Sequence, residues 1–537
     1  MKGYLVVLLS LITTLAYPQQ TKFSFAMGDE YLVPWSAMNR EFVGDESFGI
    51  AEIYTNLKKL TIVKFDPKSL NKTSENTIDL PGMSKTYRAE RVVNPGDNYY
   101  WLHSEWDNDS ESELLYADKI DIASGKITES NKKLIQASKM AGYYIERPSG
   151  PFYVKYNFDY DMEHKKLLIT YRLWPEERND KINYDRIGFF VFDENLNKLW
   201  GNEFTMPYTE AISDNSDFSV DGNGNAYLLS KIYDSERRRE RDKETGAPAY
   251  HYEIFKFVKN NKKIITVNIP ADDYFFQEAS LMETVNHNVL AAFSYSKKSS
   301  GRSTDGIFLA TIDDNNKIVK FKTGYYEFPL SELTKFESEK AKRKMEEKGD
   351  YEIANLKVRD IVVQDDGSIF VACEEFYIKH SASNQGSTSN TYKYFYENII
   401  AAKINNSGQF EWMRKIPKRQ KSLEEGGSRF NPYAGSMGFK SIYNSSGYYF
   451  LYIDNKKNLE LKEEDVPKLH LDDFGGQVML AKLSPSGVLT KEILFDPKDE
   501  NLKIYPTEFK RLSNSQLIGR GKVKNSLNYR PLAIFFK

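Results

Sequence analysis

The sequence predicts an all-β fold made of repeated four-stranded antiparallel units. Three observations lead to this prediction. A short apolar run rich in Ile, Phe and Ala recurs along the whole chain of 537 residues. A polar turn follows nearly every copy, and a second strand-like run precedes each one. The shortest spacing between copies, from Ile254 to Ile307, is about 53 residues, close to the period of known blade repeats.

The recurring run is the third strand of each unit. Its copies are LTIVKF at Leu60, LLYADK at Leu114, IGFFVF at Ile187, IFKFV at Ile254, IFLATI at Ile307, IIAAKI at Ile399, VMLAKL at Val478 and LAIFF at Leu532. The preceding second strands are SFGIAEIYT, NYYWLHSEW, KLLITYRLW, NAYLLSKIY, NVLAAFSYS, SIFVACEEF, GYYFLYID and SQLIGRGKV. Each unit therefore runs strand, tight turn, strand, loop, strand, tight turn, strand.

Four antiparallel strands per repeat around a central axis is the β-propeller plan. Eight third strands predict eight blades, and seven remain possible if residues 47–55 do not form a regular strand. The last unit ends directly after its third strand, so its fourth strand must come from elsewhere. KFSFAM, at residues 22–27, is available for this role, and we expect it to close the ring and remove two exposed sheet edges.

The D-x-[DN]-G-x-aromatic turns and the strands they connect resemble those of secreted bacterial β-propeller proteins. The resemblance covers nearly all of residues 17–537, which we expect to form one propeller domain. The chain does not repeat the Trp-Asp dipeptide of WD40 repeats or the paired glycines of kelch repeats from unit to unit. The resemblance therefore implies an architecture and no particular activity.

One turn, DGNGN at residues 221–225, resembles the start of a calcium-binding loop. Such a loop needs a bidentate Glu at its twelfth position, and that position is Ile232. Strand-forming residues follow instead of a helix. We interpret the segment as a hairpin turn, in which Gly and Asn supply positive φ angles.

The N-terminus MKGYLVVLLSLITTLA is typical of a secretory signal. It has one Lys, an apolar run too short to span a bilayer, and small residues at Thr14 and Ala16 that suit a signal peptidase. We expect residues 1–16 to be removed and the protein to be exported to the periplasm or secreted. No later stretch approaches the ~20 apolar residues of a membrane helix, so we expect a chain that does not span the membrane.

Charge and cysteine content exclude two classes. With 74 basic and 76 acidic residues the formal charge is −2, and such a balanced surface argues against a nucleic-acid partner. The only cysteine, Cys373, rules out an intramolecular disulfide framework, and its strand-like context predicts a buried thiol. Core packing must then stabilise the fold, and we expect a monomer.

The long insertions gather on one side of the predicted ring. Loops between the second and third strands, and crossings between blades, lie on the same face, which we call the loop-rich face. Its insertions are residues 106–113, 174–185, 234–251, 331–349, 379–393, 417–438 and 454–476. Residues 331–349 have a helical apolar spacing and a dense Glu/Lys remainder, which predicts a helical lid or buttress. Binding residues concentrate on loops held by a rigid scaffold, so this face is the candidate functional surface.

Aromatic residues near this face are the candidate ligand-binding residues. We select Trp106, Trp174, Phe430 and Tyr433, because Trp and Tyr rings stack on sugars or on a partner's side chains. Tyr208 and Tyr325 lie in similar positions. For each of these rings, anchoring of the loop against the blade is the simpler role.

No catalytic residue is predicted. The six His residues are scattered without zinc-binding spacing, and the sequence has no nucleotide-binding glycine loop. No cofactor is expected, although acidic loops such as residues 107–113 would suit weak Ca²⁺ binding. Our first hypothesis is a non-catalytic platform that binds a protein or a glycan. The alternative is a hydrolase or lyase acting on polysaccharides, with acids of perturbed pKa in an axial pocket.

Overall fold

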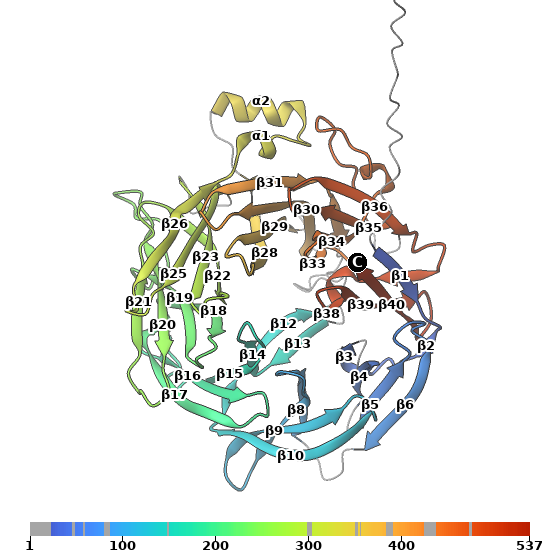
Figure 1. Cartoon of the computed structure of the whole chain (residues 1–537). Coiled ribbons are helices and arrows are strands. Elements are labelled where there is room, and N and C mark those ends of the chain that lie inside the picture. Colours follow the sequence, from blue (N-terminus) through green and yellow to red (C-terminus); the bar gives the residue numbers. More distant parts are fainter. Residues whose placement is uncertain are drawn as a thin grey trace, which may run out of the picture.

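The computed structural model describes residues 23–45, 49–56, 59–79, 86–147, 150–297, 303–348, 353–354, 356–382, 390–423, 436–471 and 475–536. These residues form eight antiparallel sheets arranged in a ring, which is an eight-bladed β-propeller (Figure 1). The prediction of an all-β propeller with eight blades is confirmed, and seven blades are excluded because residues 49–56 form a regular strand.

Each blade has four main strands, numbered here from the ring axis outwards. Blade 1 consists of β3 (Met38–Asp45), β4 (Gly49–Asn56), β5 (Lys59–Phe65) and β6 (Lys72–Asp79), and blade 2 of β7 (Arg88–Val93), β8 (Tyr99–Asp107), β9 (Ser112–Asp121) and β10 (Lys126–Ala137). Blade 3 consists of β14 (Tyr156–Tyr160), β15 (Lys166–Leu173), β16 (Tyr184–Asp193) and β17 (Lys198–Thr209), and blade 4 of β18 (Ser213–Val220), β19 (Ala226–Tyr233), β20 (Tyr250–Phe257) and β21 (Ile265–Ile269).

Blade 5 consists of β22 (Phe275–Glu283), β23 (Val289–Ser296), β25 (Gly306–Ile312) and β26 (Ile318–Glu327), and blade 6 of β28 (Leu356–Val363), β29 (Ile369–Ala382), β30 (Asn390–Ile404) and β31 (Phe410–Ile416). Blade 7 consists of β33 (Phe439–Asn444), β34 (Gly447–Asp454), β35 (Gln477–Leu483) and β36 (Leu489–Phe495), and blade 8 of β38 (Lys510–Ser513), β39 (Gln516–Val523), β40 (Asn528–Phe536) and β1 (Phe23–Met27). Smaller elements are β2 (Tyr31–Leu32), β11 (Met140–Ala141), β12 (Tyr143–Arg147), β13 (Gly150–Val154), β24 (Ser303–Thr304), β27 (Ile353–Ala354), β32 (Gln420–Leu423), β37 (Leu502–Ile504), α1 (Leu330–Leu333), α2 (Glu339–Lys348) and the 3₁₀ helices η1 (Lys456–Asn458) and η2 (Pro506–Glu508).

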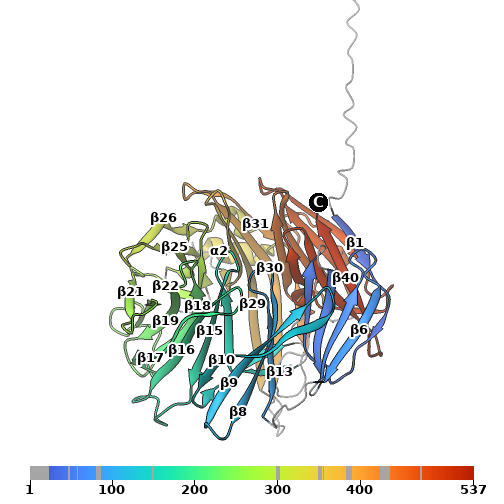
Figure 2. The ribbon, with the colours of Figure 1, turned by 60° about the horizontal axis from the view of Figure 1, so that its bottom comes forward.

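The N-terminal strand closes the ring. β1 pairs with β40 in an antiparallel register that runs from Phe23 opposite Phe536 to Met27 opposite Leu532. The strand from the start of the chain thus becomes the outer strand of blade 8, beside the C-terminal end (Figures 1 and 2). The predicted use of KFSFAM as the missing fourth strand is confirmed.

The apolar core consists of separate clusters between neighbouring blades. Successive side chains of a strand point to opposite faces of its sheet, so each blade serves two clusters. In β23, Val289, Ala291 and Phe293 pack against blade 4, whereas Leu290 and Ala292 pack against blade 6. Both faces of β23 are therefore apolar, which explains the continuous hydrophobic runs by which the repeat was recognised.

The DGNGN segment is a hairpin turn between β18 and β19, as predicted. Asp221 accepts hydrogen bonds from Asn225 N (2.8 Å), Asn225 Nδ2 (2.8 Å) and the Tyr227 hydroxyl (2.7 Å). Gly224 has a φ of 79°, a conformation that favours glycine. Both carboxylate oxygens of Asp221 are thus engaged within the hairpin.

The same turn helps to join three blades. Glu283, at the end of β22 in blade 5, accepts hydrogen bonds from Gly222 N of blade 4 (2.6 Å) and Met162 N of blade 3 (2.7 Å). His287 Nδ1 lies 2.8 Å from the same carboxylate. The side chain of Glu283 is almost fully buried, so these contacts fix the turns of blades 3 to 5 relative to one another.

The insertion at residues 331–349, predicted to be helical, contains two helices, α1 and α2. Phe336 adopts a φ of 62°, which no α-helix accommodates, and the chain turns there between α1 and α2. The turn buries both Leu333 and Phe336, and Phe336 N donates to Glu463 O (2.7 Å). α1 is held on blade 6 by Lys415 Nζ, which donates to Leu333 O (3.0 Å). Burial of two apolar side chains has outweighed helical propensity.

A hairpin that the sequence analysis did not identify interrupts the inner strand of blade 3. β11 and β14 both pair with β15, and the hairpin β12–β13 connects them. Figure 1 shows this hairpin pointing into the middle of the ring. Blade 3 therefore adds chain to the axial region, beside the inner strands of its neighbours.

A buried ionic network reinforces the closure between blades 1 and 8. Glu52 of β4 is fully buried. It accepts hydrogen bonds from the Tyr31 hydroxyl (2.6 Å), Arg40 Nε (2.8 Å) and Arg520 (3.2 Å) of β39. Arg520 also donates to Glu508 (3.1 Å). Glu52 thus pairs with two guanidinium groups at the junction where the chain ends meet, and Glu508 supplies a second counter-charge to Arg520.

We predict that Glu52→Gln lowers the free energy of unfolding by about 3–5 kcal/mol, because it leaves two partly buried guanidinium groups without a full counter-charge. Urea unfolding measures the change. Glu75→Gln is the matched control, since Glu75 pairs with Lys72 on the exposed surface and should cost less than about 1 kcal/mol. Equal effects of the two substitutions would contradict the importance of this network.

Candidate functional site

A pocket of about 750 Å³ lies between the inner strands of blades 3 and 4. β14 and β18 form its walls, and Arg91 of β7 contributes from blade 2. Further lining comes from Asp180 and Asp185, in and just after the loop between β15 and β16, and from Glu210 in the crossing to blade 4. The pocket therefore extends from the inner strands to the loop-rich face.

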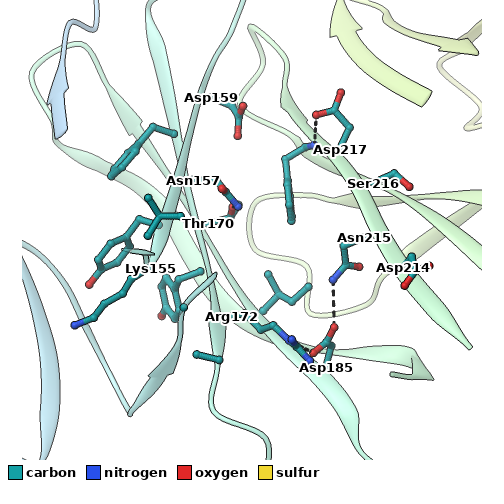
Figure 3. Close-up of a pocket in the computed structure, with 18 of the residues that line it drawn as sticks. Lys155, Asn157, Asp159, Thr170, Arg172, Asp185, Asp214, Asn215, Ser216 and Asp217 are labelled. Atoms are coloured by element: carbon teal, nitrogen blue, oxygen red, sulfur yellow. Dashed lines mark hydrogen bonds and ion pairs between the residues drawn. The ribbon is translucent and has the colours of Figure 1, made fainter. Parts of the chain in front are cut away.

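The alternation of side chains along β14 places two polar groups in the pocket. Tyr156, Phe158 and Tyr160 pack in the apolar cluster between blades 2 and 3. Asn157 and Asp159 alternate with them and project into the pocket, as Figure 3 shows. The period of two in the strand thus separates an apolar face from a polar one.

A β-bulge in β18 positions the acid on the opposite wall. The bulge lies between Asn215 and Asp217, and an extra residue of this kind changes the direction of the side chains that follow. Asp217 Oδ2 accepts hydrogen bonds from Ser280 Oγ (2.9 Å) and Leu281 N (2.7 Å), both in blade 5. Oδ1 accepts a hydrogen bond from Phe218 N (3.0 Å). Burial raises the pKa of Asp217, and these hydrogen bonds oppose the rise.

Asp159 lacks comparable support. Its Oδ2 atom is buried and receives no hydrogen bond from any residue that the structure describes. Burial raises the pKa of Asp159 to about 7, the charge of Asp217 adds to the rise, and Arg91 opposes it. Two carboxyl groups on facing strands therefore have different environments, one held by donors and one without a donor (Figure 3).

The end of the pocket near the loop-rich face is fixed by a polar network. Arg172 of β15 forms ion pairs with Asp185 and Glu210. Asn215 Nδ2 donates to Asp185 (3.2 Å), and Asn183 Nδ2 donates to Glu210 (2.7 Å). The side chains are therefore held in place before any ligand binds, which reduces the entropy lost on binding.

The lining combines acids, hydrogen-bonding groups and aromatic rings. Acidic groups outnumber basic ones: the acids are Glu90, Asp159, Asp180, Asp185, Glu210, Asp214 and Asp217, and the bases are Arg91, Lys155, Arg172 and Arg238. The polar neutral groups include Asn157, Thr170, Asn215 and Ser216, and the rings are Tyr156, Phe158, Tyr171 and Phe218. Such a surface suits a polar ligand that is neutral or positively charged.

Of the four predicted binding residues, the two that the structure describes, Trp106 and Trp174, do not line the pocket. Trp106 is partly exposed near the end of β8, just before the loop between the second and third strands of blade 2. Trp174 occupies the corresponding loop of blade 3, is 52% exposed, and has Lys139 Nζ 4.2 Å from the centre of its ring. Phe430 and Tyr433 lie outside the described residues. A ligand-binding role for these residues stays a prediction.

Tyr208 and Tyr325 contribute to structural contacts. The Tyr208 hydroxyl donates to Glu253 (2.9 Å), and the Tyr325 hydroxyl donates to Asp272 (3.0 Å). Both rings also pack against apolar clusters between blades. The simpler interpretation, that these rings anchor their strands, accounts for the contacts observed.

Exposed apolar side chains gather on the loop-rich face. Those in its loops, crossings and adjoining strand ends are Leu32, Trp35, Met38, Trp174, Ile182, Tyr184, Leu330, Ile378, Leu471 and Leu527. Trp35 is the most exposed of them, at 86%. Single exposed apolar residues are normal on protein surfaces, but their concentration on one face favours an interaction surface.

Within the described residues, metal-binding and reactive side chains do not form a second candidate site. Among the residues described, no group of three His, Cys, Asp or Glu side chains is placed to hold a metal ion. Weak Ca²⁺ binding stays a prediction. Cys373 is buried, as predicted, and burial raises the pKa of its thiol to about 12. No helix in the described part of the chain is long and apolar enough to cross a membrane.

Comparisons with known proteins do not indicate an activity for this chain. No protein-family model and no curated protein matches the chain. The WD40 domain of SCAP from fission yeast is 8% identical, with a TM-score of 0.38 over 96% of this chain and 95% of that chain. An uncharacterized protein from Listeria monocytogenes EGD-e is 9% identical, with a TM-score of 0.35 over 81% and 91%. The β-propeller domain of the Trilobed protease from Pyrococcus furiosus is 11% identical, with a TM-score of 0.29 over 74% and 98%. Assignment of the fold rests on the strand pairing described above.

The residues that line the pocket were not identified from the sequence. Asp159 and Asp217 belong to different blades, and no sequence motif links the two residues. One signal was present: Asp159 lies in YNFDY, where a polar residue alternates with aromatic ones. An acid that faces away from the apolar cluster between blades 2 and 3 must face blade 4, because side chains alternate between the two faces of a sheet.

We predict that Asp159→Asn stabilises the protein increasingly as the pH rises. The folded-state pKa of Asp159, about 7, lies above the ordinary value of 3.8 for an Asp side chain. The neutral carboxyl therefore favours folding at low pH, and this advantage is lost as the pH rises through about 7. The variant should gain up to about 4 kcal/mol over the unmodified protein between about pH 4 and pH 8, as an upper bound.

Urea unfolding across this pH range measures the difference. Asp180→Asn is the matched control, because Asp180 lines the same pocket with an exposed side chain. A gap between Asp159→Asn and the unmodified protein that is the same at every pH would contradict the assignment of Asp159 as a buried acid.

Proposed function

We propose that the protein is an exported, non-catalytic β-propeller that binds a carbohydrate in the pocket between blades 3 and 4. The observation that supports this proposal is the pocket itself, with its pre-formed polar network and aromatic rings. Its volume of about 750 Å³ lies within the range of about 300–1,000 Å³ usual for small-molecule sites. Export is proposed from the signal-like N-terminal segment at residues 1–16.

Hydroxyl-rich ligands match the chemistry of this lining. Sugar hydroxyls donate to carboxylates and accept from amide and guanidinium groups, and the pocket offers both kinds of partner. The partly buried ring of Phe218 supplies apolar surface for the C–H face of a sugar. Because a network holds Arg172 and Asn215 in advance, little ordering is required on binding.

Isothermal titration calorimetry with a panel of oligosaccharides tests the proposal. We predict that a ligand found in this way binds about 5- to 20-fold more weakly to Asn157→Ala, because a hydrogen-bonding group in the pocket is lost. Asn315→Ala is the matched control, since Asn315 is exposed in a turn of blade 5. The control should bind with unchanged affinity.

Two results would count against a carbohydrate ligand in this pocket. Binding that Asn157→Ala leaves unchanged would place the ligand elsewhere. No binding across the panel would favour a protein partner instead, and the exposed side chains Trp35 and Trp174 on the loop-rich face would then be the first to substitute.

A hydrolase acting on polysaccharides is the second candidate. It is favoured by the two acids in contrasting environments: Asp159, with a pKa near 7, suits a general acid, and Asp217, held by hydrogen bonds, suits a carboxylate base. Release of reducing ends from a polysaccharide, abolished by Asp159→Asn, would establish this activity. Binding without such release would support the non-catalytic function.

A further inference from the structure

Asp residues on the inner strands of two blades have their hydrogen bonds supplied in the same way. Asp217 of blade 4 accepts a hydrogen bond from Ser280 Oγ of blade 5 (2.9 Å). Asp360 of blade 6 accepts one from Ser441 Oγ of blade 7 (2.5 Å). In both cases the donor is a Ser hydroxyl on the inner strand of the following blade.

Asp159 of blade 3 breaks this pattern. The inner strand of the following blade presents another acid, Asp217, and no Ser donates to Asp159 within the described residues. The residue opposite Asp159 on β15 is Leu168, which has no donor in its side chain. The only cation among the groups that act on Asp159 is Arg91 of β7. A buried oxygen atom in the pocket is thus left without a donor.

The ligand group that best pairs with the Asp159 carboxylate carries both a hydrogen-bond donor and a positive charge. An unpaired buried polar atom costs free energy, so a donor that reaches Asp159 gains more than a donor at an exposed carboxylate. The surplus of acids in the pocket adds a favourable field for a cation. A hydroxyl group supplies one hydrogen and no charge, whereas an ammonium group supplies three hydrogens and a full charge.

We propose that the pocket selects carbohydrates that carry a free primary amino group, whose ammonium donates to Asp159 between blades 3 and 4. This inference rests on the proposed function, because it names the class of carbohydrate bound. Asp217 lies on the facing strand and reinforces the preference for positive charge. The oxygens of Asp217 already accept hydrogen bonds, so the ammonium group of the ligand donates its hydrogen bond to Asp159.

Two tetrasaccharides of equal length provide the test, one of glucosamine and one of N-acetylglucosamine. They differ at the nitrogen, which is charged in the first and a neutral amide in the second. Calorimetry at about pH 7 should show at least tenfold tighter binding of the glucosamine tetrasaccharide to the unmodified protein. Asp159→Asn should reduce this preference to less than about twofold, whereas the control Asp314→Asn, at an exposed position in a turn of blade 5 outside the pocket, should retain it.

Proton release gives an independent readout. Before binding, Asp159 is largely protonated at about pH 6, since burial raises its pKa to about 7. Pairing with an ammonium group requires the carboxylate, so binding should release close to one proton per site. Titrations in two buffers of different ionisation enthalpy measure this number, and Asp159→Asn should release none. Thermal unfolding verifies that the variant is folded.

The outcomes separate this inference from the function on which it rests. Equal affinity for the two tetrasaccharides would leave carbohydrate binding intact and overturn selection of the amine. A preference for glucosamine that persists in Asp159→Asn would overturn the assignment to Asp159. If neither tetrasaccharide binds, both the inference and the proposed function fail.

Discussion

The pairing of β1 with β40 is the contact on which the rest of the structure depends. A row of blades has two free ends, and each free end exposes an apolar face and an unpaired strand edge. By joining the first strand to the last blade, the chain gives every blade two neighbours. Each neighbouring pair then shares an apolar cluster, and Glu52 adds an ionic link at the junction itself.

Closure also sets the geometry of the candidate site. Inner strands around a ring converge on the axis, so side chains from blades 2, 3 and 4 reach one pocket although they are far apart in the sequence. The bulge in β18 and the hairpin inserted before β14 adapt a repeated blade to this purpose. The remaining between-blade clusters hold the ring together, which allows Asp159 to stay unsatisfied at a cost to stability.

The repetitive part of the fold was predictable because its physics is local. Apolar runs and Gly/Asn turns fix strands and hairpins, and a missing fourth strand implied closure by residues 22–27. The helical insertion was only partly anticipated, because burial of Leu333 together with Phe336 broke the helix. The hairpin β12–β13 was not predicted, although the Pro-Ser-Gly sequence between two aromatic-rich runs was a usable signal.

The candidate site was much less predictable. Composition singled out Trp106 and Trp174, and the structure places both on the loop-rich face but outside the pocket lining. The environments of Asp159 and Asp217 depend on the contact between two blades and on which hydrogen-bond donors reach each carboxylate. Such information depends on three-dimensional packing, and a single sequence does not contain it in a readable form.

Hydrogen–deuterium exchange with and without a bound oligosaccharide tests the central claim, that the ligand site lies between blades 3 and 4. Amide protection falls where the structure opens locally. A ligand that bridges two strands reduces this opening and so increases protection. The account predicts added protection in β14, β18 and the crossing at residues 209–213, with blade 7 unchanged. Protection confined to other blades, or to the outer parts of the loop-rich face, would contradict it.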